Sequence, residues 1–131
     1  MKKTSMTKKT VVAVFEDDPI DLFLYEKLFE RLSDKMTCLY VRTLEDQALL
    51  SGHLEFDMAI IDIHFWGNNV GLSILSKLRN SAGRDFIAIA ITPLLQEGDL
   101  ELIMSAGFDL CVEKPVIFQH ATHWPVGFQG T

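Results

Sequence analysis

Short runs of apolar residues recur along the chain at the length of β-strands, and stretches with helical spacing lie between most of them. The runs are Val11–Phe15, Thr37–Val41, Met58–Ile61, Phe86–Ile91 and Leu110–Val112. A run such as Met58–Ile61, which is apolar at every position, is typical of a strand buried on both faces of a parallel sheet. The pattern therefore predicts an α/β fold in three layers, with a doubly wound, five-stranded parallel sheet between helices.

The first predicted helix has a clear start, because Asp18 can cap it and Pro19 suits its first position. Asp21 adds a negative charge in the first turn, where the helix dipole favours it. The apolar positions form two adjacent stripes: Leu22, Tyr25, Phe29 and Leu32, and beside them Ile20, Leu24 and Leu28. Two interpretations follow: the helix is deeply buried, or it leaves an apolar strip for a partner helix.

Further helices are predicted at Gly71–Leu78 and at Glu97–Ala106, and Gly107 ends the second of them. Near the C-terminus, Pro125 stops any last helix. The sequence has no linker and no repeat. It therefore predicts a basic N-terminal extension over 1–10, one folded domain over 11–124 and a tail over 125–131.

The composition agrees with one globular domain, since the 131 residues are 48% hydrophobic and 23% charged. A net charge of −6 argues against nucleic acid as a partner, because binding to phosphates needs positive charge. Apolar runs are too short for a signal peptide or a membrane span, so no membrane partner is expected. Cys38 and Cys111 lie in apolar runs without metal or redox spacing, which favours reduced thiols and a cytoplasmic location.

Acidic residues directly follow two predicted strands, with Glu16 and Asp17 after the first and Asp62 after the third. Sites in parallel sheets form at the carboxyl ends of strands, so these side chains converge if the two strands are neighbours about 4.8 Å apart. Like charges about 4 Å apart repel by roughly 4 kcal/mol at an effective dielectric near 20, and a cation offsets that repulsion. Oxygen ligands without His or Cys favour Mg²⁺, or Mn²⁺, over zinc or copper. The competing interpretation is three unrelated acidic loop residues.

Two polar residues follow the remaining strands of interest, Thr92 after the fourth and Lys114 shortly after the fifth. Each alone is an ordinary residue at the end of a strand. Together with the acids they supply a carboxylate nucleophile, a hydroxyl donor and a cation, which phosphoryl transfer to an aspartate needs.

The order and spacing of these residues resemble the receiver domain of two-component response regulators, from about Val11 to Pro115. The matching segments, in order, are Phe15–Pro19, Asp57–Ile63, Gly71–Leu75, Ile91–Thr92, Ala106–Asp109 and Lys114–Pro115. The resemblance implies a flavodoxin-like fold with the strand order 2-1-3-4-5. It also implies that Asp62 accepts a phosphoryl group from a histidine kinase or a histidine phosphotransfer protein.

The resemblance also implies roles for single residues. Asp17 and Asp62 would bind Mg²⁺ directly, Glu16 would hold it directly or through water, and the backbone carbonyl of His64 would complete the protein's ligands. The Thr92 hydroxyl would donate to a phosphoryl oxygen, and the Lys114 ammonium would pair with the same group. The Lys114–Pro115 peptide bond is expected to be cis.

The sequence departs from the family pattern near the site. Phe65 and Trp66 replace the usual Met-Pro, Gly71 arrives one residue late, Pro93 replaces a small residue, and Cys111 replaces an aromatic residue. We therefore expect a reshaped loop after Asp62. We also expect any activating surface change to be smaller than usual at the fifth strand and shifted toward His64–Val70.

The remaining candidates each have two interpretations. Phe65 and Trp66 are either exposed partner contacts or folded over the loop. The His64 side chain either affects hydrolysis of a phosphoaspartate or faces solvent. His120 and His123 are spaced like metal ligands on a helix, but a solvent-facing tail is favoured because no Cys or acid accompanies them.

The expected function is that of a stand-alone receiver, phosphorylated on Asp62 in a Mg²⁺-dependent reaction, that signals by binding a downstream protein. It would not be an enzyme, apart from hydrolysing the phosphoryl group on its own Asp62. One alternative is a pseudo-receiver, or an excised receiver of a hybrid kinase, that acts as an interaction module. A second is a Mg²⁺-dependent phosphohydrolase with Asp62 as nucleophile, which is disfavoured because His64 stands where that chemistry needs an acid.

Overall fold

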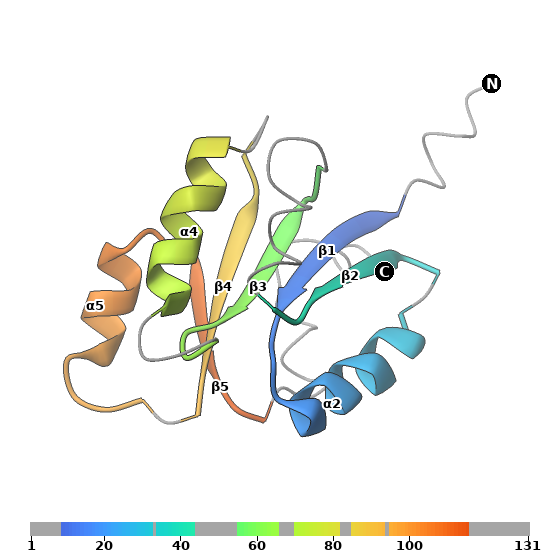
Figure 1. Ribbon diagram of the computed structural model, residues 1–131, viewed down its shortest axis with the longest axis horizontal. Helices are drawn as coiled ribbons and strands as arrows, with labels where there is room; N and C mark the ends of the chain where they lie inside the picture. The colour runs from blue at the N-terminus through green and yellow to red at the C-terminus, as the bar shows by residue number, and fades with distance from the viewer. Residues whose placement is uncertain are drawn as a thin grey trace.

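A five-stranded parallel sheet with the strand order β2-β1-β3-β4-β5 forms the middle of the structure (Figure 1). The computed structural model describes residues 9–32, 34–43, 55–65, 70–81, 85–93 and 95–115. The elements in these ranges are β1 (Thr10–Phe15), α2 (Pro19–Glu30), β2 (Met36–Val41), β3 (Met58–Asp62), α4 (Val70–Ser81), β4 (Ile87–Thr92), α5 (Asp99–Ser105) and β5 (Leu110–Glu113). The predicted α/β fold and the strand order 2-1-3-4-5 are confirmed.

Two apolar layers lie on opposite faces of the sheet, because successive side chains of a strand point to opposite sides. Phe15 of β1 packs in one layer with Ile74 of α4 and Ile103 of α5. Its neighbour Val14 packs in the other layer with Phe29 of α2. Figure 1 shows α4 and α5 on one side of the sheet and α2 on the other. The molecule therefore has the three layers that the strand pattern predicts.

The register of the strands brings the predicted site residues to one edge of the sheet. Phe15 pairs with Ile61, so the residues that follow them, Glu16 and Asp62, lie at the same level on β1 and β3. The other two candidates at this edge are Thr92, which ends β4, and Lys114, which follows β5. This edge is formed by the carboxyl ends of the strands, where ligand sites of such sheets form.

The start of α2 agrees with the predicted capping signal. The Asp18 carboxylate accepts hydrogen bonds from the backbone nitrogens of Ile20 (2.8 Å) and Asp21 (3.2 Å), and Pro19 is the first helical residue. These bonds satisfy two donors that the first helical turn otherwise leaves without a partner. The carboxyl end of β1 is therefore followed at once by a fixed helix start.

The two apolar stripes of α2 have different surroundings. The first stripe is buried, as is Leu28 of the second. In the second stripe Ile20 remains 71% exposed and Leu24 37% exposed, and Phe23 beside them is 54% exposed. The first stripe is therefore explained by burial in the core, whereas Ile20, Phe23 and Leu24 leave an exposed apolar strip near the N-terminal end of α2.

The third described helix, α5, is shorter than the sequence pattern predicts. Its expected range was Glu97–Ala106, but Gly98 has a φ of +89°, outside the helical region, so the helix begins at Asp99. Gly107, with a φ of +108°, ends the helix as predicted. In contrast, α4 is longer than its predicted range, Gly71–Leu78.

Some sequence predictions fall outside the described residues. These are the first eight residues of the basic extension, the C-terminal part of the folded domain with His120 and His123, the tail over 125–131, and Trp66. Among the helices that the structure does describe, none is long and apolar enough to cross a membrane.

Candidate functional site

Three carboxylates converge where β1 and β3 end. One oxygen each of Glu16, Asp17 and Asp62 lies within 4.8 Å of the others. Glu16 and Asp62 are buried, whereas Asp17 is exposed. The convergence predicted from the strand ends is therefore present, and Asp17 leaves the cluster open to solvent on one side.

Glu16 is the most deeply buried member of this carboxylate cluster. Its Oε2 accepts a hydrogen bond from the backbone nitrogen of Asp18 at 3.1 Å. Its Oε1 is buried without a hydrogen-bond partner among the described residues, although the Lys114 ammonium lies 3.5 Å away. Burial, together with the adjacent Asp62 carboxylate, raises the pKa of Glu16 to about 8. A buried oxygen without a donor, facing two further carboxylates, fits a hard divalent cation such as Mg²⁺.

Both side-chain oxygens of Asp62 accept hydrogen bonds. Oδ1 accepts a hydrogen bond from the backbone nitrogen of His64 at 2.9 Å, and Oδ2 accepts one from Lys114 Nζ at 2.9 Å. The side chain of Asp62 is 5% exposed. Asp62 is thus held in one orientation, with a cation on one side and a backbone donor on the other.

Lys114 connects the end of β5 to the carboxylate cluster. Its Nζ lies 2.5 Å from Asp21 Oδ2, 2.9 Å from Asp62 Oδ2 and 3.5 Å from Glu16 Oε1. Burial alone would lower the pKa of Lys114, but hydrogen bonds to Asp21 and Asp62 and the charge of Glu16 outweigh burial and raise this pKa. The backbone nitrogen of Lys114 donates to the Thr92 carbonyl at 2.8 Å, and the Lys114–Pro115 bond is cis, as predicted.

Asp21 is a site residue that the sequence analysis missed. It was interpreted only as a favourable charge in the first turn of a helix, yet its carboxylate contacts Lys114, 93 positions away. Its place four residues after Asp17, in a helix that starts at the carboxyl edge of the sheet, was the available signal. That signal is weak without the position of Lys114.

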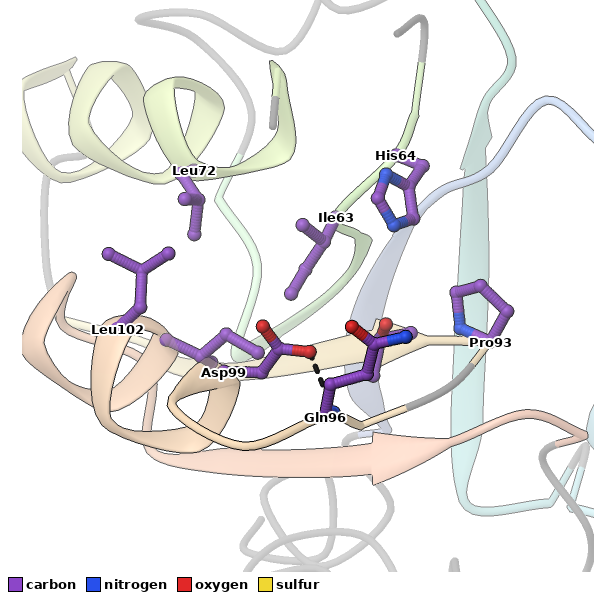
Figure 2. A pocket seen from close by; sticks show the side chains of 9 residues that line it. Ile63, His64, Leu72, Pro93, Gln96, Asp99 and Leu102 are labelled. Carbon is purple, nitrogen blue, oxygen red and sulfur yellow. Dashed lines mark hydrogen bonds between the residues drawn. The ribbon is translucent and has the colours of Figure 1, made fainter. Parts of the chain in front are cut away.

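A cavity of about 360 Å³ opens beside the cluster, between the ends of β3 and β4 and the helices α4 and α5 (Figure 2). Figure 2 shows Leu72 of α4 and Leu102 of α5 facing one another across it. Thr92, which is buried, and the exposed His64 also line the cavity. The exposure of His64 agrees with the interpretation that its side chain faces solvent.

Phe65, three residues after Asp62, belongs to the core of the molecule. Phe65 is fully buried and packs edge-on against Phe15, with 6.1 Å between ring centroids. The interpretation of Phe65 as an exposed partner contact is therefore wrong, because the ring fills a gap in the core at the end of β1. Sequence reasoning could not separate the two interpretations, since the burial of this ring depends on the path of the loop.

Gly71 has a steric reason for its place. A Cβ atom on this residue would lie 2.5 Å from the Asp62 carbonyl oxygen and 2.7 Å from Ile63 Cα. The backbone nitrogen of Gly71 donates to the Ile63 carbonyl at 3.0 Å. A glycine here lets α4 start directly against the strand end that bears Asp62.

The other two departures lie farther along the chain. Pro93 is exposed after Thr92, and Cys111 is half-buried in the edge strand β5. Burial raises the pKa of the Cys111 thiol, which favours the protonated, less nucleophilic form.

Comparisons with known proteins give a consistent picture of the fold. No protein-family model and no curated protein matches the sequence. Solved structures do match, and one is a response regulator from Thermotoga maritima, with 14% identity, a TM-score of 0.73, and coverage of 87% of this chain and 92% of that chain.

Two further similar structures contain a metal ion. The receiver domain of a sensor histidine kinase from Pseudomonas aeruginosa has magnesium in its active-site cleft; it shares 20% identity, with a TM-score of 0.73 and coverage of 88% of this chain and 93% of that chain. A response regulator from Burkholderia pseudomallei has a phosphorylated aspartic acid and a calcium ion. It shares 19% identity, with a TM-score of 0.69 and coverage of 87% of this chain and 64% of that chain.

All three identities are at or below 20%, so the likeness is one of fold. The strand order, the three layers and the coverage of most of the chain agree with it. This chain has the flavodoxin-like fold of the response regulator receiver domain, as the sequence resemblance implied.

Proposed function

We propose that this protein is a receiver that takes a phosphoryl group on Asp62 in a Mg²⁺-dependent reaction. The donor is a histidine kinase or a histidine phosphotransfer protein, and the phosphorylated protein signals by binding a downstream protein. The observation on which this proposal depends most is the carboxylate cluster at the end of β1 and β3, with the Lys114 ammonium 2.9 Å from Asp62.

The residues of the cluster suit a divalent cation. Asp17, Asp62 and Glu16 would hold it, together with the backbone carbonyl of His64 that the family resemblance implies. The buried Glu16 Oε1 without a hydrogen-bond partner among the described residues supports this assignment, as does the magnesium ion in the similar Pseudomonas aeruginosa receiver. When bound, Mg²⁺ supplies positive charge that stabilises the phosphoryl oxygens during transfer.

In the proposed transfer, an Asp62 carboxylate oxygen attacks phosphorus. The new phosphorus–oxygen bond forms as the bond from phosphorus to the donor's imidazole nitrogen breaks, and the product is an acyl phosphate on Asp62. Lys114 pairs with the phosphoryl oxygens, and the Thr92 hydroxyl donates to one of them. The phosphorylated aspartic acid in the Burkholderia pseudomallei response regulator supports this choice of nucleophile.

A protein donor needs a surface on which to dock near Asp62. The exposed apolar side chains of α2 supply one: Ile20, Phe23 and Leu24 lie on the helix that also bears Asp21. An open apolar strip beside a buried polar site favours a helix of the donor as the contact.

The test is the intact mass of the protein after incubation with acetyl phosphate and Mg²⁺. We expect wild type to gain one phosphoryl group, and Asp62→Asn to gain none. Asp85→Asn is the matched control, because Asp85 is an exposed aspartate before the opposite, amino end of β4, and it should be modified like wild type.

Failure of wild type to gain mass with Mg²⁺ would reject the proposal and leave the pseudo-receiver as the better description. Equal mass gain in wild type and Asp62→Asn would reject Asp62 as the acceptor.

A further inference from the structure

The Lys114 ammonium is shared between the proposed phosphoacceptor and a second aspartate on α2. Its Nζ lies 2.5 Å from Asp21 Oδ2 and 2.9 Å from Asp62 Oδ2. The Lys114 and Asp21 side chains are only 19% and 18% exposed. Water screens this pair less than a surface ion pair, so its charges interact more strongly.

Asp21 needs no lysine for its role in the helix. An acidic residue in the first turn is already favoured by the helix dipole, and the backbone nitrogen of Asp21 donates to the Asp18 cap at 3.2 Å. Capping and the dipole therefore do not account for the contact with Lys114. That contact joins the start of α2 to the end of β5 across the site.

The donors of Lys114 are limited. An ammonium group has three N–H donors, and carboxylates of Asp21 and Asp62 accept two of them, with Glu16 Oε1 3.5 Å away. An incoming phosphoryl group needs donors and positive charge from the same ammonium. Asp21 offsets part of that charge and occupies one of the three donors.

We propose that Asp21 is a positioning residue that keeps the Lys114 ammonium on the α2 side of the site and thereby slows phosphoryl transfer to Asp62. This inference rests on the proposed function. Its consequence is that the rate of phosphorylation is limited by a contact outside the carboxylate cluster that would hold the metal.

The test compares rates of phosphorylation by acetyl phosphate at saturating Mg²⁺, measured by intact mass. Asp21→Asn keeps the size of the side chain and an acceptor oxygen but removes the charge, and we expect it to react about three- to tenfold faster than wild type. Asp21→Ser is a second neutral variant with the same expected direction. Asp21→Glu restores the charge and should react within about twofold of wild type.

Glu30→Gln is the matched control, because it removes one negative charge from the same helix at a side chain that is 68% exposed. It should react at the wild-type rate. Because the effect of Asp21 is electrostatic, the neutral variants Asp21→Asn and Asp21→Ser should both react faster, whereas Asp21→Glu, which keeps the charge, should not. A purely structural role of Asp21 would instead let Asp21→Glu change the rate as much as the neutral variants do.

Two outcomes overturn this inference but not the proposed function. In the first, wild type is phosphorylated and Asp21→Asn reacts at the wild-type rate or more slowly. In the second, Glu30→Gln is accelerated by the same factor as Asp21→Asn. Absence of phosphorylation in both wild type and Asp21→Asn overturns the proposed function, and this inference with it. The two failures are therefore distinguishable in one experiment.

Discussion

Asp17 is the exposed member of the carboxylate cluster, and this makes it the best single residue for testing the metal site. Asp17→Asn removes one of the proposed anionic ligands without opening the core, so we expect the dissociation constant for Mg²⁺ to rise by about tenfold or more. Amide shifts recorded during a Mg²⁺ titration measure this dissociation constant. Asp34→Asn, an exposed aspartate before β2, should bind Mg²⁺ like wild type; equal affinities for wild type and Asp17→Asn would contradict the assignment.

Glu16 should make stability depend on pH. Its pKa rises from an ordinary value of 4.5 to about 8, mainly through burial, so between these values the folded state holds a proton that the unfolded chain releases. Its contribution to the free energy of unfolding is therefore full below pH 4.5 and declines as the pH rises to 8.

In metal-free buffer we expect Glu16→Gln to flatten this dependence and to raise the free energy of unfolding at pH 8 by about 1–3 kcal/mol. Urea unfolding at pH 5, 6, 7 and 8 measures it, with Glu30→Gln as an exposed control that keeps the wild-type slope. Mg²⁺ should stabilise wild type more at pH 8 than at pH 6, because it binds the ionised carboxylate. Parallel pH curves for wild type and Glu16→Gln would count against this account of Glu16.

At the scale of elements, the start of α4 is fixed by the close approach of Gly71 to β3. A methyl group there meets the Asp62 carbonyl oxygen at 2.5 Å and Ile63 Cα at 2.7 Å, both backbone atoms that yield little. We expect Gly71→Ala to lower the free energy of unfolding by about 2–3 kcal/mol in urea denaturation. Ser76→Ala, at an exposed position of the same helix, should stay within about 0.5 kcal/mol of wild type. Equal stability of the two variants would show that α4 can move away from the strand.

The elements themselves were largely predictable, because their signals are local. Apolar runs located both ends of all five strands to within one residue, and the Asp18-Pro19 cap located the start of α2. The start of α5 was missed because a left-handed backbone at Gly98 is set by the preceding loop. Phe65 and Asp21 were misjudged for a related reason, since each acts through a residue far away in the sequence or on the other side of a loop.

For the whole molecule, the parallel sheet explains why the site could be predicted while some of its contacts could not. All strands of such a sheet end at the same edge, and β1, β3, β4 and β5 are consecutive neighbours in it, so the residues that follow them lie close together there. That rule places the carboxylates, Thr92 and Lys114 near one another. It does not say which partner each side chain takes, because several carboxylates compete for one ammonium group.

Phe65 joins the loop after Asp62 to the end of β1, and this contact should direct how the molecule responds at the site. The buried ring packs edge-on against Phe15 at 6.1 Å, whereas Cys111 in β5 is small and half-buried and offers no ring that could turn inward. Close-packed side chains transmit a local shift to the residues they touch.

Binding of the phosphoryl mimic beryllofluoride with Mg²⁺ should therefore change the amide shifts of His64, Phe65 and Phe15 more than those of Leu110–Val112. Phe65→Leu, which removes the ring contact but stays apolar, should reduce the change at Phe15 while leaving that at His64. Changes concentrated in α5 and β5, with little at His64 and Phe65, would instead place the response at the β5 edge of the sheet and contradict this prediction.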